Sequence, residues 1–454
     1  MAYQETTRTS YGTRLKNSFG GIFSGIILFF AATALLWWNE GRAVKTTKML
    51  NDAQGNYTEM ADINVVDPQY NGKLVHAVGL ATTNDTLIDP FFGIKDLAIS
   101  LDRKVEYYQW QEHSQQQKKD KLGGAEEVVT TYTYEKNWVS SPISSDSFRD
   151  PAYKDKNFVL MDISDNRQRA ENVSFGAYML NKSQISSLPA DELLTPVIPE
   201  ETARRLDRDA RITFRHHASP DDPYIRNGYK GSQLAADIID NAANQAADTI
   251  RNIINENSDN KMAYNAEFIH VSGNVIYIGL TPNAPRIGDI RVTFTKATPK
   301  EVSILAAVAG NSFTNYTSKN GKAFSSITVG TKTADEMFET EHQGNKMWTW
   351  ILRIAGLLLV IAGLKGIFNF LETIMKVVPF LSGILGFGIS TVCSVVGFVW
   401  SLIVVALAWI YYRPVLGIAL LVVAGAVVFF FSKKGKELIA QHIPGTAKPD
   451  KAEQ

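Results

Sequence analysis

The sequence is poor in cysteine: its 454 residues contain one, Cys393. A single thiol cannot close an intramolecular disulfide, and it cannot supply the cysteine ligands of a structural zinc site. Cys393 lies in an apolar run near the C-terminus, so the long polar part of the chain has no cysteine. That part is long enough to bury a hydrophobic core without disulfides or metals.

The chain also lacks a net charge and the short motifs of common enzymes. Its 46 basic residues balance 46 acidic ones, and no basic stripe with interleaved aromatic residues suggests a nucleic-acid surface. No segment matches a Walker loop, a Gly-x-Ser-x-Gly elbow, a His-Glu-x-x-His helix or a dinucleotide fingerprint. We therefore expect no enzyme activity, no cofactor and no nucleic-acid partner.

Charged side chains are absent from residues 19–38. At about 1.5 Å per residue, a helix of this length crosses a hydrocarbon core of about 30 Å. Arg8, Arg14 and Lys16 precede the run and favour a cytoplasmic N-terminus by the positive-inside rule. A cleaved signal peptide fits less well, because the run is longer than an h-region and ends without a small-residue cleavage site.

Three further apolar runs predict spans at 348–370, 383–410 and 415–431. The predicted fold class is a multi-pass α-helical membrane protein with four transmembrane helices and a large extracytoplasmic α+β domain. Because basic residues flank the membrane at both termini, residues 1–18 and 432–454 are predicted to be cytoplasmic.

Residues 39–347 form the predicted extracytoplasmic domain. β-branched and aromatic runs between turn residues predict two β-rich blocks, at about 73–140 and 263–330. Between the blocks, at about 211–262, an Ala-rich stripe at helical spacing predicts a helix over 232–257. This stripe either packs on the core of its own domain or contacts another subunit.

Several short motifs are spread from the first predicted span to the last, at Phe19–Gly21, Asn39–Ala43, Leu74–His76, Val105–Trp110, Tyr132–Trp138, Pro285–Phe294, Met347–Trp350 and Tyr412–Pro414. In this order they resemble the LUMA (transmembrane protein 43) family. The resemblance implies one N-terminal span, a large lumenal domain, three C-terminal spans and a non-enzymatic role. Animal members are nuclear-envelope and endoplasmic-reticulum proteins that organise membrane complexes and self-associate. The segment 211–262 looks like an insertion, which suggests a bacterial member with a periplasmic domain in the inner membrane; the alternative is the endoplasmic reticulum and nuclear envelope.

Polar residues at the edge of the first span are candidates for a membrane-proximal assembly contact. Glu40 and Arg42 lie just outside that span, where they either anchor a subunit contact or form the polar end of a helix. Arg353 lies in the second span and can pair with Glu40, bind a lipid phosphate or extend to the interface. With Lys365 it also allows an alternative function, a channel or transport component with a polar path. A membrane-tethered hydrolase is a third alternative, which lacks a nucleophile–base pattern.

Small residues in the spans are candidates for helix packing. Gly21 and Gly25 are four residues apart in the first span, and Gly386, Ser390 and Ser394 form a stripe on the third. Such surfaces serve either packing among the chain's own spans or contacts between subunits. We predict a homo-oligomeric membrane scaffold, with lipids and other membrane proteins as further partners.

Histidines give little indication of a metal site. The nearest approach to a cluster is formed by His216, His217, Asp221 and Asp222. Neighbouring side chains point different ways and flanking prolines mark a loop, so we predict a solvated loop and no metal. His76 and His270 occur in apolar strands, where a structural role is expected.

Overall fold

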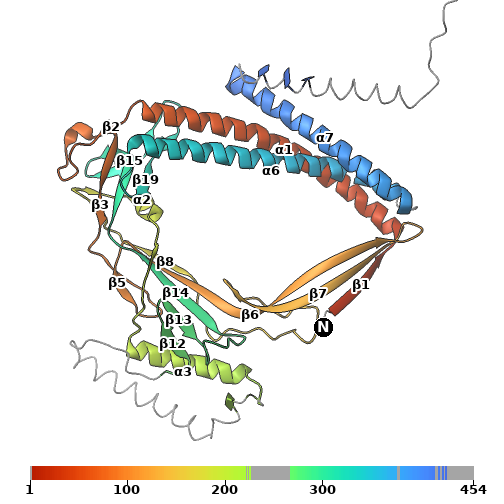
Figure 1. The fold of residues 1–454 in the computed structure, drawn as a ribbon, viewed down its shortest axis with the longest axis horizontal. Helices are drawn as coiled ribbons and strands as arrows, with labels where there is room; N and C mark the ends of the chain where they lie inside the picture. Colours follow the sequence, from red (N-terminus) through yellow and green to blue (C-terminus); the bar gives the residue numbers. More distant parts are fainter. Residues whose placement is uncertain are drawn as a thin grey trace, which may run out of the picture.

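The structure is a computed structural model that describes residues 3–220, 222, 224–225, 266–375, 379–414 and short pieces between 418 and 426. A β-rich domain and a layer of long helices lie opposite each other and meet at both ends of the first helix (Figure 1). The predicted Ala-rich helix at 232–257 and the predicted tail at 432–454 lie outside the described residues.

The helical layer consists of α1 (Tyr11–Gln54), α6 (Ala334–Met375) and α7 (Pro379–Tyr412). The Ser10 side chain caps α1 by accepting a hydrogen bond from the Thr13 amide. α1 and α6 run side by side in opposite directions, and α7 packs across both (Figure 1). Each of the three helices has an apolar stretch long enough to cross a membrane.

The predicted fold class of four transmembrane helices with an α+β domain is wrong. The described residues contain three helices of sufficient length and apolarity, and the domain beside them is rich in β-strands. The predicted third span, 383–410, is part of α7, and the predicted fourth, 415–431, lies largely outside the described residues. Apolar runs and strand patterns in a sequence do not locate helix ends or show which strands pair, which is why the sequence alone did not predict this architecture.

The first sheet has eight strands, and its main path is antiparallel in the order β1–β7–β6–β14–β13–β12. β8 pairs with β6, and β11 pairs with β14. The strands are β1 (Tyr3–Thr9), β6 (Ser100–Asp120), β7 (Glu126–Val139), β8 (Asn166–Arg169), β11 (Glu192–Leu193), β12 (Ile269–Ser272), β13 (Val275–Ile278) and β14 (Ile290–Ala297).

The second sheet has seven strands in the order β19–β15–β16–β10–β9–β3–β2, with β15 also paired to β3. The strands are β2 (Thr58–Glu59), β3 (Leu74–Thr82), β9 (Ser174–Phe175), β10 (Tyr178–Met179), β15 (Lys300–Ala309), β16 (Ser312–Thr314) and β19 (Ser326–Val329). The described part of the domain also contains two small hairpins, formed by β4 (Thr86–Ile88) with β5 (Lys95–Leu97) and by β17 (Tyr316–Thr317) with β18 (Ala323–Phe324), and the helical segments Pro68–Tyr70 (a 3-10 turn), α2 (Lys182–Ser187) and α3 (Glu200–His217).

The two predicted β-rich blocks are interleaved, so they are not separate units. In the first sheet β6 pairs with β14 over eight residues, with Val105 opposite Val292. In the second sheet β3 pairs with β15, with Ala77 opposite Ile304. Every one of these four side chains is almost fully buried, so burial of apolar strand faces favours pairing between strands that are about 190 and about 230 residues apart in the sequence.

The helical layer is continuous with the core of the domain at one end. Leu50 and Ala53 of α1 and Phe338 of α6 pack with Leu74 of β3 and Leu305 of β15 in a single buried cluster. We call this contact the domain root. It fixes the angle at which α1 and α6 leave the second sheet.

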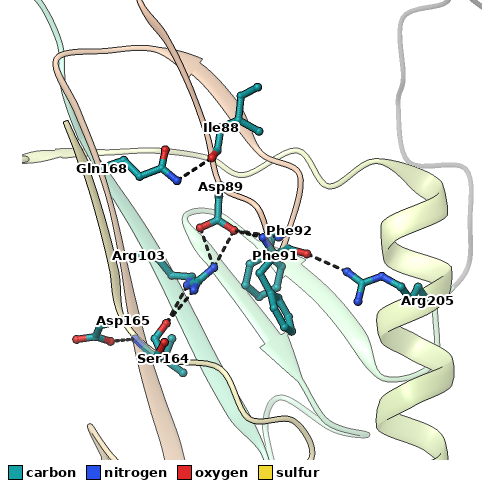
Figure 2. A network of polar contacts seen from close by, with 10 residues as sticks. Ile88, Asp89, Phe91, Phe92, Arg103, Ser164, Asp165, Gln168 and Arg205 are labelled. Carbon is teal, nitrogen blue, oxygen red and sulfur yellow. Dashed lines mark hydrogen bonds and ion pairs between the residues drawn. The ribbon is translucent and has the colours of Figure 1, made fainter. Parts of the chain in front are cut away.

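A buried ion pair fixes the loop between β4 and β5 to the first sheet (Figure 2). Arg103 Nη1 donates to both carboxylate oxygens of Asp89, at 2.8 and 2.7 Å. Its Nε and Nη2 donate to the Ser164 carbonyl oxygen at 3.0 and 2.9 Å, and the guanidinium lies 5.7 and 5.8 Å from the ring centres of Phe91 and Phe92. Such a network is structural, because its donors are consumed within the core.

Candidate functional site: a polar junction of three helices

Glu40 lies where α1, α6 and α7 meet, and its side chain is 1% exposed. Arg353 of α6 forms a two-point ion pair with it: Nε donates to Oε1 at 2.7 Å and Nη2 to Oε2 at 2.8 Å. The indole Nε1 of Trp409 in α7 also donates to Oε2. One carboxylate therefore joins all three helices through charge-assisted hydrogen bonds, which are stronger than neutral ones.

Arg353 is held between aromatic rings as well as by Glu40. Its guanidinium carbon lies 4.9 Å from the ring centre of Trp350 and 5.2 Å from that of Trp409. Indole faces attract cations, so the rings replace part of the water that the charge loses on burial. The pair has a structural role, because the carboxylate and the guanidinium meet each other's charge and hydrogen-bonding groups.

A second set of polar contacts lies directly beside this pair. Asn39, which is fully buried, donates from Nδ2 to the Thr349 carbonyl oxygen at 3.0 Å. Arg42 donates to Asn39 Oδ1, to Asn345 Oδ1 at 3.3 Å and to Thr349 Oγ1 at 3.1 Å. Asn345 Nδ2 donates in turn to the Ala43 carbonyl oxygen at 3.1 Å. These contacts join α1 to α6 between the ion pair and the domain root; with Glu40, Arg353 and Trp409 we call them the polar junction.

Gly41 makes the junction possible because α7 approaches α1 closely there. A Cβ atom at position 41 would lie 2.6 Å from the Tyr412 hydroxyl oxygen. All four residues from 39 to 42 therefore have a role. Asn39 and Arg42 form hydrogen bonds to α6, Glu40 supplies the carboxylate, and Gly41 allows the close approach of Tyr412. The sequence indicates a polar helix end at these positions, but it does not indicate which helices they join.

The small residues at 21 and 25 pack within the chain. A Cβ atom at Gly25 would lie 2.7 Å from the Gly363 carbonyl oxygen, and one at Gly21 would lie 3.7 Å from that of Gly366. Ser394 donates to the Ser390 carbonyl oxygen within α7. The surroundings of Gly386 lie outside the described residues.

Lys365 is far from the polar junction. It borders an open cavity of about 340 Å³ between α6 and α7, together with Asn369, Glu372, Ile389 and Ser390. Arg353 and Lys365 are separated by 12 positions of one helix, or about 18 Å. Arg353 points into its ion pair, so the two cations do not form a common polar surface in the part of α6 that the structure describes.

The histidines have structural contacts. The His217 ring stacks on Phe158, and Asp222 pairs with Arg286 at 3.0 Å; Asp221 lies outside the described residues. His76 contacts Glu59 and the Lys332 carbonyl oxygen, whereas the His270 ring contacts the Gly279 carbonyl oxygen in the other sheet. No group of three metal-ligating side chains occurs among the described residues.

Sequence reasoning missed Trp409, Asn345 and Thr349. Trp409 lies in an apolar run, and Asn345 and Thr349 lie where the polar domain sequence ends. The spacing of Asn345, Thr349 and Arg353, four residues apart, is a usable signal: it places three polar side chains on one face of a helix that is entering an apolar region.

Comparisons with known proteins support the family resemblance. A family model described as transmembrane protein 43 matches residues 107–228 and 231–414. Transmembrane protein 43 of Rattus norvegicus and that of Homo sapiens are each 26% identical to the chain over 411 residues, covering 88% of this chain and 86% of theirs. A transmembrane protein 43 homolog of Drosophila melanogaster is 23% identical over 418 residues, covering 90% and 93%. No solved structure matches the chain.

Proposed function

Because this chain belongs to the transmembrane protein 43 family, we propose that it is a non-enzymatic membrane scaffold that holds its β-rich domain at a fixed place on the membrane. The polar junction carries this proposal. Glu40 binds α6 and α7 at once, and ten residues further along α1 Leu50 enters the domain root. The three helices and the β-rich domain are therefore joined into one unit, which we call the frame. Such a unit suits a scaffold, which holds other proteins in place.

The non-enzymatic part of the proposal is supported by the composition of the buried polar sites. Both buried arginine–carboxylate pairs described above are fully used in internal contacts. The similar proteins of rat, human and fruit fly are named as transmembrane proteins, and their names state no reaction.

We place self-association on the β-rich domain. The glycine pair in α1 is already occupied by α6 of the same chain, so the small residues at 21 and 25 are not free to bring two copies together. The membrane in which the assembly forms, bacterial or eukaryotic, stays a prediction.

Particle mass in lipid nanodiscs tests the scaffold directly. We expect a discrete multimer. The variant Leu193→Ser tests whether the exposed strand β11 takes part in the contact between copies: loss of the multimer would place β11 in that contact, and an unchanged multimer would place the contact elsewhere. A strictly monomeric particle would contradict self-association. Ion flux into liposomes that contain this protein alone would contradict the scaffold and support the transport alternative.

A further inference from the structure

We propose that the base of the β-rich domain contains a binding site for the phosphate of an anionic phospholipid, formed by Arg42, Lys45 and Lys322 where α1 leaves the membrane. We call these three residues the basic cluster. The site goes beyond the scaffold role, because it concerns a lipid ligand, and it is independent of what the frame assembles.

α1 is positively charged over the stretch that follows its uncharged run. Between Glu40 and Asp52 the helix contains the basic residues Arg42, Lys45 and Lys48 and no acidic residue. Arg42 and Lys45 are three positions apart, and like charges at this spacing share a helix face and repel each other. This part of α1 therefore attracts anions from its surroundings.

The turn between β17 and β18 brings a further cation to the same part of α1. Lys322 Nζ donates to Thr46 Oγ1 at 2.7 Å, and Asn320 Nδ2 in the same turn donates to the Lys45 carbonyl oxygen at 2.7 Å. Thr46 and Arg42 are four positions apart, so they lie on one face of the helix. Because both hydrogen bonds fix the turn on α1, the ammonium group of Lys322 is in place before a ligand binds.

The acidic residues that flank this stretch of α1 are paired with other cations. Asp52 Oδ1 lies 3.5 Å from Nζ of Lys319, which belongs to the same turn as Lys322. Glu40 Oε1 lies 2.7 Å from Arg353 Nε. Among the described residues, no carboxylate forms an ion pair with a member of the basic cluster. The cluster therefore keeps its positive charge.

This unbalanced charge is unfavourable where it is partly buried. The pKa of Lys322 is lowered, first by burial and then by the positive charges of Arg42 and Lys45. Burial also lowers the pKa of Arg42, against the opposing effect of Glu40. A bound anion would favour the charged form of both side chains. The geometry of the cluster and its electrostatics thus point to the same kind of ligand.

The basic cluster lies at the depth of lipid headgroups. Trp38, which is 57% exposed, ends the uncharged run at the position of an aromatic belt. Arg42 is four positions beyond it, or about 6 Å along the helix axis. The headgroup layer extends about 5–7 Å beyond each face of the hydrocarbon core. Lys45 lies about 4.5 Å further along the axis, a distance that an extended lysine side chain can cover.

An anionic headgroup fits the basic cluster better than a zwitterionic one. Lys322 has three N–H donors and uses one of them at Thr46, and Lys45 is exposed, so both can donate to phosphate oxygens. Arg42 is hydrogen-bonded within the polar junction and contributes mainly its charge. A choline or ethanolamine group would add another cation where the flanking carboxylates are already paired. A glycerol headgroup adds none.

Acylation of lysines in nanodiscs tests the site without changing the protein. The full chain is placed in nanodiscs of phosphatidylcholine, with or without phosphatidylglycerol, and the acylation rate of each lysine is measured by mass spectrometry. We expect phosphatidylglycerol to slow acylation of Lys322 and Lys45 several-fold. Lys319, which is 85% exposed, is the internal control and should react equally in both. Unchanged rates at Lys322 and Lys45 would overturn the proposal.

A second arm identifies the source of the phosphate. Inorganic phosphate is added to nanodiscs of phosphatidylcholine alone, and the same acylation rates are measured. We expect Lys322 and Lys45 to stay reactive, because the lipid is held at the cluster by the bilayer as well as by its phosphate. Protection as strong as that given by phosphatidylglycerol would overturn the assignment to a lipid and indicate a soluble phosphate compound.

Affinity for short-chain phosphatidylglycerol, measured on the solubilised full chain, tests the individual residues. Each lysine beside an anionic lipid contributes about fivefold in binding, so we expect Lys45→Gln and Lys322→Gln each to weaken binding by about that factor. Lys322→Arg keeps the charge and should bind as the wild type does. Lys319→Gln is the matched control and should also leave binding unchanged. An equal loss in Lys319→Gln would mean general attraction to surface charge and would contradict a defined site.

Discussion

At the scale of residues, the buried carboxylates of Glu40 and Asp89 are each paired with an arginine, and breaking such a pair lowers stability. Removing one partner of a buried ion pair leaves the other charge without compensation, which costs about 3–5 kcal/mol. Exposed pairs such as Arg204–Glu200 are worth much less, about 0–1 kcal/mol. Substitutions that break a buried ion pair are therefore expected to lower stability much more than substitutions that break a pair on the surface.

Arg103→Met tests the pair in the domain. The change leaves the carboxylate of Asp89, whose side chain is 2% exposed, without its partner, so we expect unfolding free energy to fall by about 3 kcal/mol or more. Arg167→Met is the control, because Arg167 is exposed on β8 and should change stability by less than about 0.5 kcal/mol. Denaturant titration of both variants measures the difference; equal effects would refute the structural role of the pair.

The buried carboxyl group of Asp289 leads us to predict that the stability of the fold depends on pH. Burial raises its pKa to about 6, against the opposing hydrogen bonds from the Tyr277 hydroxyl and the Arg286 amide. Because the folded state holds the proton more tightly than the unfolded one, this group stabilises the fold most at low pH, and that contribution is lost as pH rises through about 6. The loss is at most about 3 kcal/mol. In Asp289→Asn this component disappears, so stability should fall less between pH 4 and pH 7 than in the wild type. An unchanged pH profile in thermal unfolding would contradict the assignment.

At the scale of elements, the contact between α1 and α6 depends on glycine. The backbone of α6 at Gly363 and Ile367 leaves no room for a side chain at position 25, whereas nothing lies within 4 Å of a Cβ at Gly20. Close backbone approach of this kind is typical of helix pairs in membranes. The two glycines, five residues apart on one helix, therefore form a matched pair for mutation.

Gly25→Leu should separate α1 from α6, whereas Gly20→Leu should not. We expect the first variant to lose several kcal/mol of stability in detergent, because overpacking moves backbone on both helices. Resistance to unfolding by a denaturing detergent measures this, with Gly20→Leu as the control. Loss of stability in both variants would mean that apolar bulk in α1 is harmful in general.

The sequence indicates the apolar centres of α1 and α6 but not their lengths or partners. Residues 43–54 mix polar and apolar side chains, and they continue α1 because Leu50 and Ala53 pack in the domain root. The strand β1 has no apolar alternation, since Tyr3 to Thr9 includes Gln, Glu, Arg and three Thr, and its pairing comes from β7, about 120 residues away. Register between distant strands depends on tertiary packing, and a single sequence does not contain that information. For the polar junction, the sequence allows the pairing of Arg353 with Glu40 as one of several interpretations, because charge is visible in a sequence and helix orientation is not.

At the scale of the whole molecule, the β-rich domain contacts α1 at both of its ends. One contact is the domain root, and the other is at the tip of the β6–β7 hairpin, which we call the hairpin tip; the frame is in this sense closed. A closed frame resists opening more than either contact alone, because release at one end leaves the other in place. The weaker closure is the hairpin tip, which depends on β1 and on the contacts of Tyr11 and Arg14.

Arg14→Gln should open the frame at the hairpin tip. The tip contains lysines at 118, 119 and 121, so we expect trypsin to cleave there several-fold faster in this variant, since cleavage follows the population of the open form. Lys16→Gln, at an exposed position of the same helix, is the control and should match the wild type. Equal cleavage rates in all three proteins would show that Arg14 does not close the frame.

A double-mutant cycle at the polar junction tests the central claim that Glu40 and Arg353 hold the helices together. Glu40→Gln, Arg353→Met and the double variant are unfolded in lipid bicelles, and the coupling energy is taken from the four stabilities. We predict a coupling of about 2 kcal/mol or more, because each single change leaves a buried charge unpaired and the double change removes both. Additive effects, within about 0.5 kcal/mol, would contradict the account: the two residues would then stabilise the protein independently, and the frame would have no ion pair at its centre.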